Sequence, residues 1–287
     1  MHRRLAVLAL AALASLALVL AGQPPASAAP SSGFNDWNCR PSAKHPEPVL
    51  LLHGLGGNGP GNFLTLGPYL VGQGYCVYAE TYGMPLPPIP VGGLVSVDAS
   101  ARENAARIDK ILASTGASKV DIIGHSEGGY LSLAIPKFLP GYAAKIKNVV
   151  ALAPPTHGTT FAGLVTLGQQ LGIMPQVNQV LAGAGCVACT QLTTGAPEIA
   201  KLTSGPIAQP GVAYTVIASK TDELVTPTDT AFVDEPGVRN MYVQDVCPSD
   251  TVGHIGLAYD DTVSRTIANT LDPDAHQPVP CGNGLPF

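Results

Sequence analysis

The chain has 287 residues, of which 46% are hydrophobic and only 12% are charged. This composition supports one large buried core, and the length suits a single α/β domain. With 15 basic and 20 acidic side chains the net charge is −5, which argues against nucleic-acid binding and against electrostatic attraction to anionic lipid.

The N-terminal segment is typical of a secretory signal peptide. Arg3 and Arg4 precede an unbroken apolar run at 5–21, and the small-residue sequence Ala26-Ser27-Ala28 follows. We predict cleavage after Ala28, which leaves a secreted, extracellular chain of residues 29–287 with a net charge of −7 once both arginines are removed. A transmembrane anchor is the alternative, but the run is barely long enough for one. We expect no transmembrane segment in the mature chain.

Strands and helices are predicted to alternate along the exported chain. Apolar or β-rich runs predict strands at 48–52, 75–80, 120–123, 148–153, 212–219 and 238–245. Helical spacing and breaker residues predict helices at about 61–72, 97–116, 127–138 and 262–271. Continuous apolar strands that alternate with helices predict a mostly parallel sheet with helices on both faces.

All six cysteines lie in the predicted exported part, and an even number in an oxidising compartment predicts three disulfides. Spacing alone does not choose among the pairings; our expectation is Cys39–Cys76, Cys186–Cys189 and Cys247–Cys281. The short spacing in the second pair is also compatible with a redox or zinc motif. It lacks two further ligands nearby and the strand-to-helix context of a thioredoxin-like motif. We expect neither a metal ion nor an organic cofactor.

The sequence Gly124-His125-Ser126-Glu127-Gly128 stands between the predicted strand 120–123 and the helix that follows it. This pattern is typical of a nucleophile elbow, a sharp strand-to-helix turn that presents the serine Oγ above the sheet. Glycine is needed on both sides because side chains there would clash in so tight a turn. In a glycine-rich chain the pattern also occurs by chance, so its strand and helix context is what makes Ser126 the predicted nucleophile.

A serine nucleophile needs a histidine base, and that histidine needs an acid. In a chain of this type the acid and then the histidine follow the serine. His254, after the last predicted strand, is the predicted base, since no suitable acid lies between Ser126 and His157. Asp222, just beyond the strand 212–219, is the predicted acid. Its alternatives are Glu223 and Asp229, and a turn-forming role that needs no catalysis.

Two backbone N–H groups are expected to bind the oxyanion. One belongs to Glu127, directly after the serine. The other belongs to Leu55, in the loop His53-Gly54-Leu55-Gly56-Gly57 after the first strand. A phosphate cradle is the alternative for this loop, but it lacks a Gly-Lys-Ser/Thr ending and Rossmann spacing.

Four motifs in this order carry a family resemblance: His-Gly-Leu-Gly-Gly, Gly-His-Ser-Glu-Gly, Thr-Asp-Glu-Leu-Val-Thr-Pro and Gly-His-Ile-Gly-Leu. They resemble secreted actinobacterial lipases and esterases of the α/β-hydrolase superfamily, over nearly the whole mature chain, and are similar to the small triacylglycerol lipases of bacilli and pseudomonads. The resemblance implies an α/β-hydrolase fold and carboxylic ester hydrolysis. It implies Ser126, Asp222 and His254 as the triad, with Leu55 and Glu127 as oxyanion donors. No acidic cluster matches the structural calcium site of the pseudomonad relatives.

The segment at about 155–210 has no predicted strand and forms a cap-like insertion. An insertion of this kind lies over the carboxyl ends of the strands, where ligands bind. It contains too many large apolar residues for a solvated loop, namely Phe161, Leu164, Leu167, Leu171 and Ile173. These residues predict a packed cap helix, an apolar wall for an acyl chain, or both.

We therefore expect a lipase that hydrolyses triacylglycerols or related apolar acyl esters through an acyl-enzyme. The alternatives are a short-chain or polyester-type esterase and an acyltransferase with the same triad. An inactive binding protein is disfavoured because all three triad residues are present, and a peptidase because no carboxylate cluster or basic pocket is evident. The expected state is a monomer that meets its apolar ester substrate, with a lipid–water interface as one setting.

Overall fold

Six parallel strands lie at the centre of the structure, in the spatial order β2-β1-β3-β4-β5-β6. The computed structural model describes residues 33–275, 277–282 and 284, so the predicted signal peptide at 1–28 lies outside the described residues. All neighbouring strands pair in parallel, which confirms the predicted α/β architecture. The strands are β1 (Val49–Leu52), β2 (Val77–Tyr78), β3 (Val120–His125), β4 (Ile146–Leu152), β5 (Ala213–Ala218) and β6 (Val238–Tyr242).

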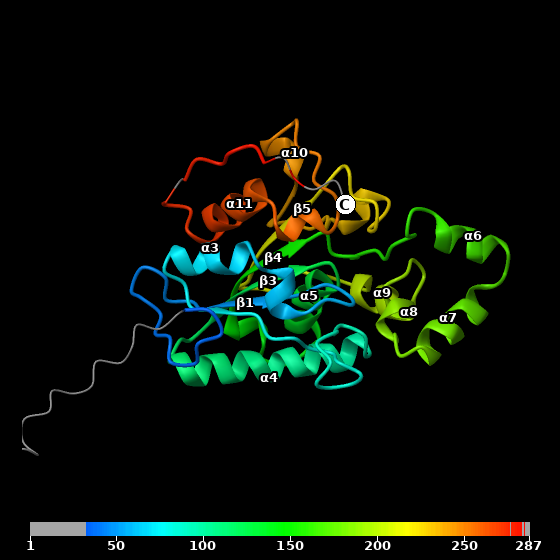
Figure 1. The fold of residues 1–287 in the computed structure, drawn as a ribbon, viewed down its shortest axis with the longest axis horizontal. Coiled ribbons are helices and arrows are strands. Elements are labelled where there is room, and N and C mark those ends of the chain that lie inside the picture. The colour runs from blue at the N-terminus through cyan, green and yellow to red at the C-terminus, as the bar shows by residue number, and fades with distance from the viewer. Residues whose placement is uncertain (1–32, 276, 283, 285–287) are drawn as a thin grey trace, which may run out of the picture. The chain divides into compact units, whose positions relative to one another are not determined.

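Helices cover both faces of the sheet, with α4 and α5 on one face and α3 and α11 on the other (Figure 1). Within the described ranges, no helix is both long and apolar enough to cross a membrane. The α-helices are α2 (Gly59–Asn62), α3 (Leu66–Gly72), α4 (Val97–Thr115), α5 (Glu127–Phe138), α6 (Leu164–Gln170), α7 (Met174–Gly183), α8 (Ala188–Gln191), α9 (Pro197–Thr203), α10 (Val243–Val246) and α11 (Asp261–Leu271). The short 3-10 helices are η1 (Ala143–Lys145), η2 (Thr228–Ala231) and η3 (Gly256–Ala258).

Each strand sends alternate side chains to the two faces of the sheet. In β1, Leu50 and Leu52 pack in the core beneath α4 and α5. Val49 and Leu51 pack in the core beneath α3 and α11. All four are fully buried, because a parallel sheet covered on both faces leaves no solvent-facing side. This is why β1 is apolar at every position rather than alternating.

Three predicted elements differ in extent from those observed. The helix predicted at 61–72 is two helices, α2 and α3, separated by a turn at 63–65. The strand predicted at 75–80 is only two residues long, near the edge of the sheet, where Val77 pairs with β1 on one side and forms an isolated bridge to Phe34 on the other. The strand predicted at 238–245 ends at Tyr242, because the Tyr242 N–H donates to Asp245 Oδ2 at 2.8 Å and begins the helical turn α10.

The segment between β4 and β5 contains four helices, α6 to α9, and its two halves differ in burial. The half with α8 and α9 packs on the core through Ala188, Leu192, Ile199 and Leu202. The half with α6 and α7 projects away from the sheet (Figure 1). A packed cap helix was expected here, and for α6 and α7 that expectation is wrong. These helices pack on each other, and four of the five apolar residues are 44–69% exposed: Leu164, Leu167, Leu171 and Ile173.

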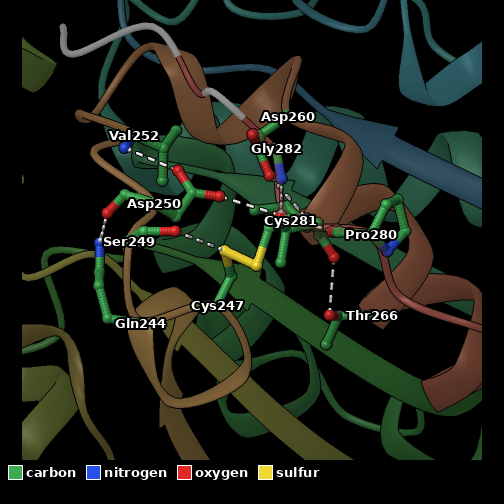
Figure 2. Close-up of a disulfide and its surroundings, with 12 residues drawn as sticks. Gln244, Cys247, Ser249, Asp250, Val252, Asp260, Thr266, Pro280, Cys281 and Gly282 are labelled. Carbon is green, nitrogen blue, oxygen red and sulfur yellow. Dashed lines mark hydrogen bonds between the residues drawn. A yellow bond between two sulfur atoms is a disulfide. The ribbon is translucent and has the colours of Figure 1, made fainter.

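Three disulfides are present, Cys39–Cys76, Cys186–Cys189 and Cys247–Cys281, the same pairs as expected from the sequence. Figure 2 shows the third of these, which holds the C-terminal segment around Cys281 beside Asp250 and Asp260. Thr262 Oγ1 connects Asp250 to this C-terminal segment, since it lies 2.9 Å from Asp250 Oδ2 and accepts the Gly282 N–H at 2.7 Å. The disulfide thus lies at the base of the loop between α10 and α11.

The order of the strands determines where a ligand site is expected. The chain passes from β1 outward to β2 and then returns to β3, on the other side of β1. The loops after β1 and β3 therefore leave the sheet in opposite directions, and a crevice opens outside the carboxyl ends of these two strands. The predicted oxyanion loop follows β1, and Ser126 follows β3.

Candidate active site

Ser126 lies on a sharp turn between the last residue of β3 and the first residue of α5. Its backbone has φ 57° and ψ −119°, a strained conformation for a residue with a side chain. A Cβ added at Gly124 would overlap the Gly128 carbonyl oxygen, and one added at Gly128 would overlap that of Leu52. Only glycine therefore fits at both positions, as the sequence pattern predicts.

Asp222 and His254 are buried side chains joined by a hydrogen bond of 2.8 Å between Asp222 Oδ2 and His254 Nδ1. A carboxylate only accepts, so Nδ1 carries the proton and Nε2 presents a lone pair. The other oxygen, Asp222 Oδ1, accepts the N–H groups of Leu224 and Val225, both at 2.8 Å. The turn-forming role considered for Asp222 is thus present together with the contact to the imidazole.

The two alternative acids occupy other places. Glu223 Oε2 accepts the backbone N–H of His254 at 3.2 Å. Asp229 lies in η2 and is exposed. In the described part of the chain, Asp222 is therefore the carboxylate that contacts the imidazole of His254.

Ser126 and His254 border the same cavity, which has a volume of about 440 Å³. No hydrogen bond joins the Ser126 hydroxyl to His254 among the described residues. Contacts of this kind are often loose without substrate and tighten only in the reacting complex. The structure thus brings the acid and the base into direct contact, and places the serine on the same cavity as the base.

The loop after β1 lies against the serine. A Cβ added at Gly54 would be 3.2 Å from Ser126 Cβ. The loop is held by hydrogen bonds from Gly57 N to Gly54 O (3.0 Å) and from Gly56 N to Gly92 O (2.9 Å). The N–H of Leu55 makes no hydrogen bond to any described residue, and that of Glu127, the first residue of α5, has no intrahelical acceptor. Both donors remain open to a ligand oxygen.

Burial disfavours the charged form of two titratable side chains next to this loop, Glu127 and His53. The Glu127 carboxyl is fully buried, and burial raises its pKa well above the usual range. Burial lowers the pKa of His53 to about 4. The ring of His53 bridges Gly54 O, 2.8 Å from Nδ1, and the Tyr82 N–H, 3.1 Å from Nε2. His53 thus holds the loop through these two contacts, and burial disfavours a charge on either side chain.

The cavity lining is mainly apolar. Its described lining residues include no Asp, Glu, Lys or Arg, and burial together with the adjacent His254 lowers the pKa of His125 to about 3. Nor do any three His, Cys, Asp or Glu side chains of the described ranges gather to hold a metal ion. Such a pocket suits an uncharged apolar group. The apolar lining residues are Leu55, Pro155, Phe161, Leu192, Leu224, Val225, Ile255 and Tyr259.

Sequence reasoning assigned no role to two polar side chains at this site, His125 and Asn62. His125 Nε2 lies 2.9 Å from the carbonyl oxygen of His254, 129 positions away in the sequence. Asn62 Oδ1 accepts the N–H of Gly54 at 2.8 Å, and its side-chain amide reaches His125. No local pattern signals the contacts of His125 with His254 and Asn62, because each joins segments that follow different strands.

Comparison with known proteins relates this chain to lipases. The triacylglycerol lipase of Burkholderia plantarii is 30% identical over 164 residues, which are 56% of this chain and 40% of that protein. The triacylglycerol lipase of Pseudarthrobacter phenanthrenivorans is 31% identical over 121 residues, 41% of this chain and 36% of that protein. The chain thus spans well under half the length of these two relatives.

The fold is also that of known lipases. The crystal structure of Aspergillus fumigatus lipase B superposes with a TM-score of 0.59 and 19% sequence identity, over 86% of this chain and 56% of that one. The family model described as lipase (class 2) matches residues 46–267, a range that includes the elbow, Asp222 and His254. Since that match covers most of the sequence, this chain belongs to the lipase (class 2) family.

Proposed function

We propose that this chain is a serine hydrolase of apolar carboxylic esters, with Ser126 as nucleophile, His254 as base and Asp222 as acid. The observation that carries the proposal is the buried Asp222–His254 hydrogen bond beside the cavity that Ser126 also borders. Family membership and the two triacylglycerol lipase relatives support an ester as the substrate.

In the proposed reaction, Ser126 Oγ attacks the ester carbonyl carbon while His254 Nε2 accepts the hydroxyl proton. Asp222 stabilises the resulting imidazolium. The carbonyl oxygen becomes an oxyanion, which the N–H groups of Leu55 and Glu127 bind. When the tetrahedral intermediate collapses, the alcohol leaves with the proton from His254 and the acyl group stays on Ser126. A water molecule, deprotonated by His254, then hydrolyses this acyl-enzyme and releases the acid.

The cavity and its surroundings favour a substrate with an apolar acyl group. The cavity lining is apolar and without charged residues in its described part. Phe161, a lining residue, lies three positions before the first residue of α6. A chain of at least several carbons placed in this cavity would replace water against apolar side chains, which contributes about 0.8 kcal/mol for each buried methylene.

A lipid–water interface is the proposed setting of the reaction. Six residues form an exposed apolar surface on α6 and α7, here called the α6–α7 surface, and are 37–70% exposed: Leu164, Leu167, Leu171, Ile173, Val177 and Val180. The surrounding sequence 148–197 contains no Asp, Glu, Lys or Arg. An exposed apolar patch without charges favours contact with lipid through burial of apolar area rather than electrostatic attraction.

Secretion and a monomeric state complete the proposal. The three disulfides support an oxidising compartment, in agreement with the N-terminal sequence. One chain supplies every residue of the candidate site, which supports a monomer as the active form.

The test is hydrolysis of p-nitrophenyl esters with short to long acyl chains by the purified mature chain and by Ser126→Ala. We expect Ser126→Ala to lower kcat by at least about 10³-fold. Ser114→Ala, on α4 with its hydroxyl bonded to Ile111 O, is the matched control and should retain activity. Undiminished turnover by Ser126→Ala would overturn the proposal. Formation of a new ester when an alcohol is added would show acyl transfer instead of hydrolysis.

A further inference from the structure

The backbone of His254 is held by the sequence neighbours of Ser126 and Asp222. Its N–H donates to Glu223 Oε2 at 3.2 Å. Its carbonyl oxygen lies 2.9 Å from His125 Nε2. We propose that His125 and Glu223 are positioning residues, which act through His254 by fixing its imidazole relative to the nucleophile and the acid. This inference rests on the proposed function.

The hydrogen-bond partners determine the tautomer of His125. A carbonyl oxygen only accepts, so Nε2 carries the proton and donates it to His254 O. Nδ1 is then an acceptor, and the amide Nδ2 of Asn62 lies 3.2 Å from it. Because His125 is buried with its pKa lowered to about 3, it keeps this neutral form throughout the pH range in which esterases work. His125 is thus a fixed donor rather than a second base.

Asn62 extends the same set of contacts to the oxyanion loop. Since its Nδ2 donates to His125, its Oδ1 is the acceptor of the Gly54 N–H, at 2.8 Å. Gly54 precedes Leu55, one of the proposed oxyanion donors. The hydrogen bonds therefore run from the loop after β1, through the elbow, to the loop that carries His254.

The loop that carries His254 needs such support because little of it has regular structure. Residues 251–253 lie in neither a helix nor a strand, and His254 is in a turn. Side chains from elsewhere hold its earlier part too, since Ser219 Oγ and Thr221 Oγ1 both donate to Val252 O. A displacement of about 1 Å in a catalytic group can cost about 10²-fold in rate. Two hydrogen bonds to the peptide groups of His254 restrict such a displacement.

The first test compares two substitutions of His125. His125→Leu fills the buried space but removes the donor, whereas the amide nitrogen of His125→Gln can still donate to His254 O. We expect His125→Leu to lower kcat by about 10- to 100-fold with KM changed by less than about 3-fold. His125→Gln should stay within about 5-fold of wild type. Rates are expressed per active site, counted by titration with a p-nitrophenyl phosphonate, so that unfolded protein does not contribute.

The second test applies the same logic to Glu223. Glu223→Ala removes the acceptor of the His254 N–H, and Glu223→Gln retains one. We expect kcat to fall by about 3- to 10-fold in Glu223→Ala and to recover in Glu223→Gln. In the double variant with His125→Leu the two losses should not multiply, because both contacts act on one residue.

Two matched controls separate positioning from general stability. His45→Leu removes another buried histidine, which stacks on Tyr75. Glu235→Ala removes another carboxylate that accepts backbone N–H groups, those of Ile207 and Ala208. Neither residue borders the cavity, so both variants should lower Tm while leaving kcat per active site unchanged.

Three results would overturn the inference. They are full kcat per site in His125→Leu, failure of His125→Gln to restore kcat lost in His125→Leu, and equal losses of kcat per site in the two controls. Ser126→Ala distinguishes this failure from that of the proposed function. If Ser126→Ala is inactive while His125→Leu is fully active, only the positioning role is wrong. If Ser126→Ala is fully active, the proposed function itself is wrong.

Discussion

Asp222 Oδ2 lies 2.8 Å from His254 Nδ1, although the two residues are 32 positions apart and neither belongs to a helix or strand. β5 ends at Ala218, four positions before Asp222, and the disulfide of Cys247 lies at the base of the loop that carries His254. The second carboxylate oxygen is occupied by two backbone N–H groups. Asp222 therefore has one orientation available, and that orientation sets the tautomer of His254.

Asp222→Asn should reverse this tautomer. The amide oxygen would keep the bonds to Leu224 and Val225, so the amide nitrogen would face His254 Nδ1 and require it to accept. Nε2 would then carry the proton and lose its basic lone pair. We expect kcat for p-nitrophenyl esters to fall by about 10³-fold or more with little change in Tm. Asp229→Asn, at an exposed site, is the control, and an equal loss there would contradict the assignment.

Gly128→Ala should destabilise the fold, because the added Cβ would overlap the carbonyl oxygen of Leu52 in the adjacent strand. We expect a loss of about 3 kcal/mol in the free energy of unfolding, or a decrease of about 10 °C in Tm for a domain of this size. Gly72→Ala is the matched control, since its Cβ would meet nothing within 4 Å. Thermal unfolding by circular dichroism measures both. Equal Tm values for the two variants would argue against the tight elbow.

Asp121→Asn should change the pH dependence of stability. Burial raises the pKa of Asp121 from 3.8 to about 7 in the folded state. A raised folded pKa stabilises the fold below the ordinary value near 3.8, and this contribution is lost as the pH rises through about 7. Asparagine cannot ionise, and it can still accept the two hydrogen bonds from Asn148. We expect Asp121→Asn to be more stable than wild type at pH 9 by about 2–4 kcal/mol and similar to it at pH 4.

Urea unfolding of Asp121→Asn and wild type across this pH range is the measurement. Asp109→Asn is the control. The hydrogen bond from Lys145 lowers the pKa of the exposed Asp109 carboxyl, so the pH-dependent change in stability of this variant should have the opposite sign. A stability difference for Asp121→Asn that does not grow between pH 4 and pH 9 would refute the assigned ionisation.

Polar substitutions on the α6–α7 surface should weaken activity at a lipid–water interface but leave activity on soluble esters unchanged. Leu167 and Val180 are 51% and 70% exposed, so Leu167→Ser with Val180→Ser should leave the fold intact. Each apolar side chain that enters lipid contributes about 1.5–3 kcal/mol. We expect binding to phosphatidylcholine vesicles and turnover of an emulsified long-chain ester to fall by at least about 10-fold, with soluble short-chain esters unaffected. Val246→Ser, on the partly exposed α10, is the control. An equal effect of Val246→Ser, or no effect of Leu167→Ser with Val180→Ser, would contradict the proposal.

The sequence by itself determined the fold class. The apolar or β-rich runs at 48–52, 120–123 and 212–219 indicated buried parallel strands, because a sheet covered on both faces needs mostly apolar side chains on both sides of each strand. The nucleophile elbow could also be predicted from the sequence, since a turn this tight leaves room only for glycine at two of its five positions. The order of serine, acid and histidine then nominated Ser126, Asp222 and His254 as the site to test.

The tertiary structure decided the remaining features, because they depend on contacts between loops that lie far apart in the sequence. The apolar residues of α6 and α7 have the composition of a buried cap, and only their place in the fold shows that solvent reaches them. The hydrogen bonds of His125 to His254 and to Asn62 join segments that follow different strands, so they form only because those strands belong to one sheet. Local sequence encodes propensity and steric fit over a few residues. Which polar groups face one another across the carboxyl ends of the strands follows only from the order of the strands.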